Sequence, residues 1–249
     1  MGRVKFLSLI IPAFRQEKTI AQDLKNLQKA LSVLPLKYEI IVVVDGGGDG
    51  TFRNAKNVRG KEIVVVGYDR NIGKGFAIKN GVEKAKGDVI GFIDAGMDLD
   101  PTEISIMLDI MSWNKADIVI GSKLHPESKV SYPCWRKILS WGYRTLTHLM
   151  FGFSVRDTQV GLKIFKRKVA KDVFPHIIVK RFAFDVEVLA VAQKLGYTRI
   201  YEAPVKLNFN GANAITSTSF WKVILSMLWD TVAVFYRLKI LHYYDRIKK

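Results

Sequence analysis

The sequence predicts an α/β fold in which a parallel, Rossmann-like sheet is flanked by helices. Short apolar runs typical of buried strands alternate with longer segments of helical periodicity. Glycine-rich or acidic turns follow two of these runs, at residues 45–51 and 94–100. Strands separated by helical patterns of this length indicate βαβ units, which build parallel sheets. A chain of 249 residues is long enough for one large domain with a substantial core.

The first half of the chain supplies most of these elements. Five strands are expected, at Phe6–Ile11, Tyr38–Val44, Ile63–Val66, Asp88–Ile93 and Asp117–Gly121. Three helices are expected between them, at Thr19–Leu34, Gly73–Lys86 and Pro101–Asn114. Pro101 suits a first helical turn, where its missing N–H would be unpaired in any case.

Composition limits the class of protein. Hydrophobic residues make up 49% of the chain and charged residues 25%, which is typical of globular proteins. A single cysteine, Cys134, excludes an intrachain disulfide and a cysteine-rich metal site. The apolar run near the N-terminus is short and lacks a small-residue cleavage site, so we interpret it as the first strand and not as a signal peptide.

The net charge of +16 is unevenly distributed. Residues 1–122 carry 17 basic and 15 acidic side chains, whereas residues 123–181 carry 13 basic and 3 acidic ones. The basic middle of the chain favours an anionic partner, such as phosphates or an acidic membrane face. Nucleic acid is not expected, because the basic residues lie among bulky apolar ones at helical spacing and not between exposed aromatics on strands.

Three carboxylates follow the strand at Val89–Ile93, namely Asp94, Asp98 and Asp100. Open α/β sheets bind ligands at the carboxyl ends of their strands. Oxygen ligands placed there suit a divalent cation whose coordination shell a substrate diphosphate completes. A capped loop with solvated acidic side chains is the alternative.

A glycine-rich loop follows the second strand. Its spacing is neither that of a dinucleotide-binding motif nor that of a P-loop. Gly46, Gly47 and Gly48 allow a ligand to approach the backbone, and Asp45 could accept a hydrogen bond from a base or ribose. A flexible turn explains the same residues equally well.

Several motifs in order resemble the family 2 glycosyltransferases. They are Ile10-Ile-Pro-Ala-Phe14 with Glu17, the loop Val-Val-Asp-Gly-Gly-Gly-Asp-Gly-Thr51, Asn71-Ile-Gly-Lys-Gly-Phe-Ala77 with Gly81, and the Asp94 stretch. In the second half they are Gly121-Ser-Lys123, Asp157-Thr-Gln-Val-Gly-Leu-Lys163, Phe184-Asp-Val-Glu187, Gly196-Tyr and Glu202-Ala-Pro-Val205. More narrowly, residues 6–207 resemble the dolichol-phosphate mannose and glucose synthases, which glycosylate polyprenyl phosphates.

The resemblance implies a GT-A fold that binds a nucleotide-sugar and a divalent cation, Mg²⁺ or Mn²⁺. The nucleotide-sugar-binding residues implied are Pro12, Ala13, Phe14, Glu17, Asp45, Gly46, Lys74, Asp94 and Ala95. Asp94 and Asp98 are the implied metal ligands. The usual second aspartate of the metal motif is replaced by Gly96, and Arg15-Gln16 replaces a usual Asn-Glu.

The implied reaction is an inverting displacement at the anomeric carbon by a lipid phosphate oxygen. The catalytic residues implied are Asp94, Asp157, Lys123 and Arg136. Those expected to bind the acceptor phosphate are Lys123, Arg136, Lys137, Gln159 and Lys163. The family usually has an arginine at position 123, which can bind a phosphate through two hydrogen bonds. Lys123 offers a single compact charge and is expected to hold the acceptor phosphate less firmly. For any one of these cations, taken alone, a solvated surface charge is the more common explanation.

The predicted organisation is a GT-A domain at residues 1–207, followed by a hinge and an amphipathic membrane-interface helix at residues 208–249. Within the domain, residues 1–122 form the nucleotide-sugar-binding half and residues 123–207 the acceptor half. Two amphipathic helices are expected near residues 135–153 and 221–236, with the polar segment 209–219 as a hinge or acceptor loop. Neither helix has 18 uncharged apolar residues, so both are expected to lie in a membrane interface. Packing of both helices on the core is the alternative.

The predicted function is hexose transfer to a polyprenyl or dolichyl phosphate, with a slight preference for UDP-glucose over GDP-mannose as donor. The expected location is the cytoplasmic face of a membrane, with peripheral or interfacial attachment and a possible homo-oligomer. Two alternatives stay open. One is an enzyme of the same fold that uses a soluble acceptor. The other is a non-catalytic nucleotide-sugar-binding protein, which Gly96 makes plausible.

Overall fold

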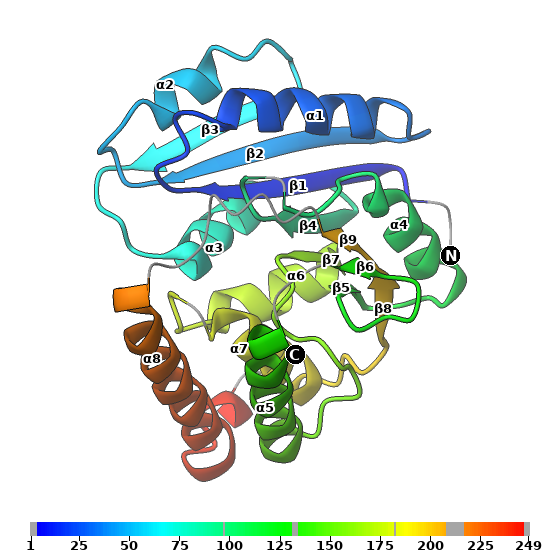
Figure 1. Cartoon of the computed structure of the whole chain (residues 1–249). Coiled ribbons are helices and arrows are strands. Elements are labelled where there is room, and N and C mark those ends of the chain that lie inside the picture. Colours follow the sequence, from blue (N-terminus) through cyan, green and yellow to red (C-terminus); the bar gives the residue numbers. More distant parts are fainter. Residues whose placement is uncertain (1–3, 97, 131–133, 182, 208–216, 247–249) are drawn as a thin grey trace.

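A seven-stranded sheet forms the centre of the protein (Figure 1). The computed structural model describes residues 4–96, 98–130, 134–181, 183–207 and 217–246. The strands follow the order β3-β2-β1-β4-β7-β5-β8. Their bounds are β1 Phe6–Ala13, β2 Lys37–Asp45, β3 Ile63–Tyr68, β4 Val89–Ile93, β5 Ile118–Ser122, β7 Leu162–Lys166 and β8 Ile200–Pro204. The five strands predicted from sequence are all present, with ends shifted by no more than two residues.

Helices cover both faces of the sheet. One face carries α1 (Ile20–Ser32), α2 (Thr51–Lys56) and α4 (Glu103–Trp113); the other carries α3 (Lys74–Lys84), α6 (Arg167–Val173) and α7 (Phe184–Lys194). Alternate residues of β1 feed the two cores: Leu9 and Ile11 face one, and Ile10 faces the other. The long β-branched run of β2 is buried on both sides, as parallel strands between two helical layers are.

The five strands expected from sequence run parallel to one another, and β7, which was not expected, is the exception. This strand runs antiparallel to both β4 and β5 and separates them. Its first residue, Leu162, pairs with Ile93 at the end of β4, and Gly161 O accepts a hydrogen bond of 2.9 Å from Asp94 N. Because β7 enters the sheet at the end where β4 leaves it, β7 has to run in the opposite direction. A second sheet, of β6 (Lys129–Val130) and β9 (Lys206–Leu207), lies beside it.

Two long helices extend from the side of the sheet that carries α7 (Figure 1). They are α5 (Cys134–Phe151) and α8 (Ser217–Phe235), and a 2.8 Å hydrogen bond between Tyr143 Oη and Thr231 Oγ1 joins them. Of the predicted hinge 209–219, residues 209–216 lie outside the described residues, and α8 begins at Ser217. In the described part of the chain, no helix combines the length and apolar character that crossing a membrane requires.

The chain after α8 folds back onto the body of the protein. It forms a π-helical turn, η2 (Tyr236–Ile240), and a 3₁₀ turn, η3 (Tyr243–Arg246). Val234, Leu238 and Tyr244 are buried in the same core as α7. The other side of α8 exposes an apolar stripe at helical spacing, consisting of Leu225, Trp229 and Val232 and continued by Tyr236 of η2. Thus α8 packs on the core with one side and presents apolar surface with the other, and contact of that surface with a membrane stays a prediction.

Candidate active site

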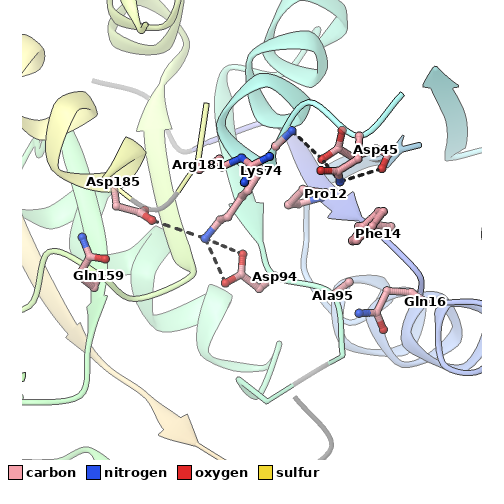
Figure 2. A pocket seen from close by; sticks show the side chains of 13 residues that line it. Pro12, Phe14, Gln16, Asp45, Lys74, Asp94, Ala95, Gln159, Arg181 and Asp185 are labelled. Atoms are coloured by element: carbon pink, nitrogen blue, oxygen red, sulfur yellow. Dashed lines mark hydrogen bonds and ion pairs between the residues drawn. The ribbon is translucent and has the colours of Figure 1, made fainter. Parts of the chain in front are cut away.

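A cavity of about 550 Å³ opens at the carboxyl ends of β1, β2 and β4 (Figure 2). Eight of the residues predicted from sequence line it: Pro12, Ala13, Phe14, Asp45, Lys74, Asp94, Ala95 and Gln159. Five others line it as well: Gln16, Asn71, Gly73, Arg181 and Asp185. The fold therefore brings together residues between positions 12 and 185, at the end of the sheet where open α/β folds bind ligands.

Lys74, at the first position of α3, crosses the floor of the cavity. Its Nζ lies 2.8 Å from Oδ1 and 3.1 Å from Oδ2 of Asp94, and 3.5 Å from Oδ2 of Asp185 (Figure 2). Burial alone would lower the pKa of Lys74, but the carboxylates of Asp185 and Asp94 outweigh burial and raise it. The side chain therefore stays a cation that bridges two anions.

Asp185, at the start of α7, belongs to the same cluster. Its Oδ1 accepts a 2.5 Å hydrogen bond from Lys163 Nζ, and the same ammonium donates 2.6 Å to Val160 O. Burial would raise the pKa of Asp185, but the ammonium groups of Lys163 and Lys74 hold it below the usual range. Lys163, which was predicted to bind the acceptor phosphate, is fully buried on β7, and its charge faces Asp185.

Asp45 organises the start of α3. Its Oδ1 accepts from Ile72 N at 2.7 Å, and its Oδ2 accepts from Gly73 N and Asn71 Nδ2, both at 2.9 Å. These bonds supply acceptors for backbone N–H groups that a helix N-terminus leaves unpaired. Gly46, with φ +108°, lies next to Asn71 and is not part of the cavity wall.

Phe14 and Gln16 follow β1 and line the side of the cavity that lies away from Asp185 and Gln159 (Figure 2). Arg15 between them has a left-handed φ of +53°, and its guanidinium lies 5.2 Å from the centre of the Phe14 ring. Glu17 points elsewhere, because its Oε2 accepts a 3.0 Å hydrogen bond from Gly50 N at the start of α2. Glu17 thus holds the glycine-rich loop, outside the residues that line the cavity.

The turn after β4 places Asp94 in the cavity, with 47% of its side chain exposed. Gly96 has φ +92°, and its N–H donates 3.0 Å to Oδ2 of the buried Asp23 on α1. Burial raises the pKa of Asp23, and the nearby carboxylate of Asp98 acts in the same direction. A glycine suits position 96 because this backbone conformation is strained for residues with a Cβ.

The described residues contain no group of three or more His, Cys, Asp or Glu side chains arranged to hold a metal ion. Carboxylate oxygens nevertheless suit Mg²⁺ and Mn²⁺, and the Asp94 carboxylate lines the cavity with about half of its side chain exposed. Mg²⁺ commonly binds one or two carboxylates and completes its shell with substrate phosphates and water. Asp94 fits a site of that kind.

The predicted acceptor residues gather around a second loop. Asp157 is buried; its Oδ2 accepts from Lys123 N at 3.0 Å, and its Oδ1 accepts from Gln159 N at 3.2 Å. Glu202 Oε1 in turn accepts from the backbone N–H groups of Arg156 and Asp157. The structure therefore brings Lys123, Asp157 and Gln159 together. Arg136 and Lys137 fall in α5, but their side chains lie outside the described residues.

Residues 8–174 match glycosyl transferase family 2. The chain belongs to this family. A dolichyl-phosphate beta-glucosyltransferase from Drosophila melanogaster is 31% identical over 244 residues, which cover 90% of this chain and 74% of the relative. The human protein of the same name is also 31% identical, over 87% of this chain and 71% of its own.

Solved structures with a similar fold include two sugar-phosphoglycerate synthases. Glucosyl-3-phosphoglycerate synthase from Mycobacterium tuberculosis, in complex with Mn²⁺, UDP and phosphoglyceric acid, has a TM-score of 0.70 at 17% identity, covering 98% of this chain and 80% of that one. Mannosyl-3-phosphoglycerate synthase from Rubrobacter xylanophilus has a TM-score of 0.66 at 16% identity, over 94% and 75%. The chain is a glycosyltransferase with the predicted GT-A fold.

Sequence reasoning gave no role to Asp185 or Arg181, although both line the cavity. A signal for Asp185 was present, because the motif Phe184-Asp-Val-Glu187 contains a carboxylate at the start of an apolar helical pattern. No comparable signal marks Arg181, which is one of many cations in a basic stretch.

Proposed function

We propose that this protein transfers glucose from UDP-glucose to a dolichyl or polyprenyl phosphate at a membrane surface. The observation that carries the proposal is the 31% identity, over about nine-tenths of the chain, to dolichyl-phosphate beta-glucosyltransferases. The cavity supplies the chemistry that this reaction needs, namely an apolar end for a base and a charged end for a diphosphate.

The donor is expected to lie across the cavity with its base near Pro12 and Phe14. Its diphosphate then lies among Lys74, Arg181 and Asp94. Near the N-terminus of α3, the backbone N–H groups of Ile72, Gly73 and Gly75 already donate to Asp45 or to Lys180 O. Side-chain cations, and a divalent cation on Asp94, are therefore expected to neutralise most of the diphosphate charge.

In the reaction, an oxygen of the lipid phosphate attacks the anomeric carbon from the face opposite the diphosphate. The new C–O bond forms as the bond to the diphosphate oxygen breaks, so UDP leaves and the configuration inverts. A phosphate is already anionic at neutral pH, so positioning and charge stabilisation matter more than a strong base. A bound Mg²⁺ or Mn²⁺ would neutralise negative charge on the leaving diphosphate. Lys74 and Arg181 stabilise the same charge, and Asp185 fixes the position of Lys74.

The acceptor is expected to approach from the side of Lys123, Gln159 and α5. Gln159 lines the donor cavity and belongs to the same loop as Asp157, so this loop connects the donor cavity to the expected acceptor side. The apolar stripe of α8, together with exposed Trp141 on α5, offers a surface for the headgroup region of a bilayer. Peripheral attachment through this surface would bring a lipid phosphate within reach of the site.

The test is transfer of radiolabelled sugar to a short polyprenyl phosphate in the presence of Mg²⁺, Mn²⁺ or EDTA. We expect labelled lipid from UDP-glucose, much less from GDP-mannose, and none with EDTA. The Asp94→Asn variant should lose transfer, whereas Asp109→Asn, an exposed carboxylate on α4, should not. Label in a soluble phosphorylated acceptor and none in lipid would favour the alternative acceptor. Binding of UDP without transfer or donor hydrolysis would favour the non-catalytic alternative.

A further inference from the structure

Glu187 on α7 is a fully buried carboxylate with four hydrogen-bond partners. Its Oε1 accepts from Tyr244 Oη at 2.5 Å and from a terminal guanidinium nitrogen of Arg237 at 3.1 Å. Its Oε2 accepts from the backbone N–H groups of Ile178 at 2.9 Å and Val179 at 2.7 Å. One oxygen thus faces the C-terminal segment (residues 236–246), and the other faces the loop before α7.

The loop that Glu187 holds continues directly to the donor cavity. Lys180 O accepts a 2.9 Å hydrogen bond from Gly75 N at the start of α3, and Arg181 lines the cavity. The buried carboxylate of Glu187 holds the backbone N–H groups of Ile178 and Val179, which directly precede Lys180. Residues 178–181 therefore link the C-terminal segment to the cavity wall.

Two glycines, one just before α3 and one in its first turn, show how closely this loop packs. A Cβ added to Gly73 would lie 2.3 Å from Lys180 O, and one added to Gly75 would lie 2.6 Å from Val179 O. The glycines let the protein's own backbone approach. Lys74, between them, can then point at Asp94 (Figure 2). Movement of residues 178–181 would change the start of α3 and hence the position of Lys74.

We propose that Arg237 and Tyr244 are positioning residues for donor binding, acting through Glu187 and residues 178–181 on the start of α3. The C-terminal segment is then part of the donor site, even though none of its residues lines the cavity. The activity measurements below rest on the proposed function, but the structural measurement does not.

Removing one partner of a buried charged hydrogen bond leaves the remaining charge poorly solvated. In Arg237→Ala, Glu187 loses the guanidinium that lies 3.1 Å from its Oε1, and its hold on the loop weakens. Tyr244→Phe removes only the hydroxyl donor and keeps the buried ring, so it is the milder variant should Arg237→Ala fold poorly. Lys239→Ala is the matched control, because it removes an exposed cation from the same turn, η2.

The first measurement is hydrogen exchange at the amides of Gly75, Ile178 and Val179 in the full chain. We expect exchange about tenfold faster in Arg237→Ala, since one hydrogen bond to a charged group is worth at least that factor. Tyr244→Phe should show a smaller increase in the same amides, and Lys239→Ala should match the wild type. Unchanged exchange at Gly75 in folded Arg237→Ala would overturn the proposal.

The second measurement separates positioning from general destabilisation. UDP affinity and the KM for the donor should weaken roughly tenfold in Arg237→Ala, while the KM for the lipid acceptor stays near the wild-type value. Arg237→Lys should recover part of the donor affinity, because it restores a cation near Glu187. If Arg237→Ala only lowered the fraction of protein that is active and left both KM values unchanged, the proposal would be contradicted. If the wild type binds no UDP, the proposed donor is wrong, and exchange at Gly75 still decides whether the C-terminal segment holds the cavity wall.

Discussion

Asp94 and Gly161 are in direct contact where β4 ends and β7 begins. Asp94 N donates a 2.9 Å hydrogen bond to Gly161 O, and a Cβ on Gly161 would lie 1.9 Å from Oδ2 of Asp94. No side chain fits there while the Asp94 carboxylate keeps its position. The antiparallel strand β7 therefore determines where the carboxylate at the end of β4 can lie.

The Gly161→Ala variant is expected to fold but to transfer sugar poorly. The half-exposed Asp94 side chain can rotate away from the added methyl group, and a displacement of about 1 Å can cost roughly 100-fold in rate. Steady-state kcat/KM and thermal unfolding together check this. Gly142→Ala on α5, where a Cβ meets nothing within 4 Å, should keep full activity. Wild-type kcat/KM in Gly161→Ala would show that the position of Asp94 does not limit the reaction.

Replacing Lys74 by methionine is expected to lower kcat/KM by roughly 100-fold or more, because a preorganised charge is lost from the cavity. Asp94 and Asp185 then face each other without the ammonium that lies 2.8 Å and 3.5 Å from them. Asp185 still has Lys163, so the fold should survive. Steady-state kinetics with UDP-glucose measure the effect, and Lys84→Met, at an exposed site on the same helix, serves as the control. Equal rates in the two variants would remove Lys74 from the mechanism.

Restoring the usual aspartate with Gly96→Asp is expected to destabilise the protein without raising activity. The backbone at position 96 has φ +92°, where a residue with a Cβ costs about 1–2 kcal/mol. Urea unfolding and transfer assays at several Mg²⁺ and Mn²⁺ concentrations check both parts. Higher activity or tighter metal dependence in this variant would mean that the turn readily adopts the arrangement usual in the family.

Asp117 should make stability depend on pH in the acidic range. Burial would raise the pKa of Asp117, but hydrogen bonds and ion pairs with Arg199 and Lys166 hold it below its usual value. Its contribution is thus present above the unfolded-state pKa and is lost as pH falls through the lower folded-state pKa.

The wild type should therefore exceed Asp117→Asn in unfolding free energy by about 1–3 kcal/mol at neutral pH. The difference should shrink once the pH falls below about 4, the usual aspartate pKa. Urea unfolding of both proteins at a series of pH values measures this difference. A difference that does not vary with pH would show that the asparagine acts through packing alone.

Trp229→Glu should weaken binding to lipid vesicles by about tenfold or more, because a large apolar side chain no longer inserts. Vesicle flotation with phosphatidylserine-containing membranes measures the bound fraction. Trp113→Glu on α4 is a close control, since Trp113 and Trp229 are 78% and 76% exposed. Equal losses in the two variants would indicate non-specific adsorption, and no loss in Trp229→Glu would rule out the α8 stripe as the docking surface.

Much of the nucleotide-sugar half could be predicted from sequence because its signals are local. Apolar runs located the strands, the position of Asp94 after a strand pointed to a ligand site, and Lys74 was implied by a motif shared with family 2 glycosyltransferases. The antiparallel β7 was missed because its run of five residues, 162–166, includes two lysines and gives no strand pattern. A lysine such as Lys163 is usually solvated, and only the fold shows that Asp185 makes its burial tolerable.

The sequence did not predict which side chains form hydrogen bonds with residues far away in the chain. Asp45 was expected to bind a base or ribose, and the structure shows it accepting three hydrogen bonds from residues 71–73. Glu187 was noticed only as part of a motif, since its partners Arg237 and Tyr244 lie 50 and 57 residues away. Such pairings depend on how α7 and the C-terminal segment pack, which no local pattern encodes.

The position of β7 also has a consequence for how the chain folds during synthesis. Strand β5 belongs to the first 122 residues, yet within the described part of the chain its partners in the sheet are β7 and β8. When β5 leaves the ribosome, its neighbours have not yet been made, and the sheet stops at β4 until residues 162–166 arrive. An exposed, fully apolar strand such as Ile118–Ile120 is prone to mispairing during that interval. During synthesis, β5 therefore has to wait for about 40 further residues before its first partner strand can pair with it.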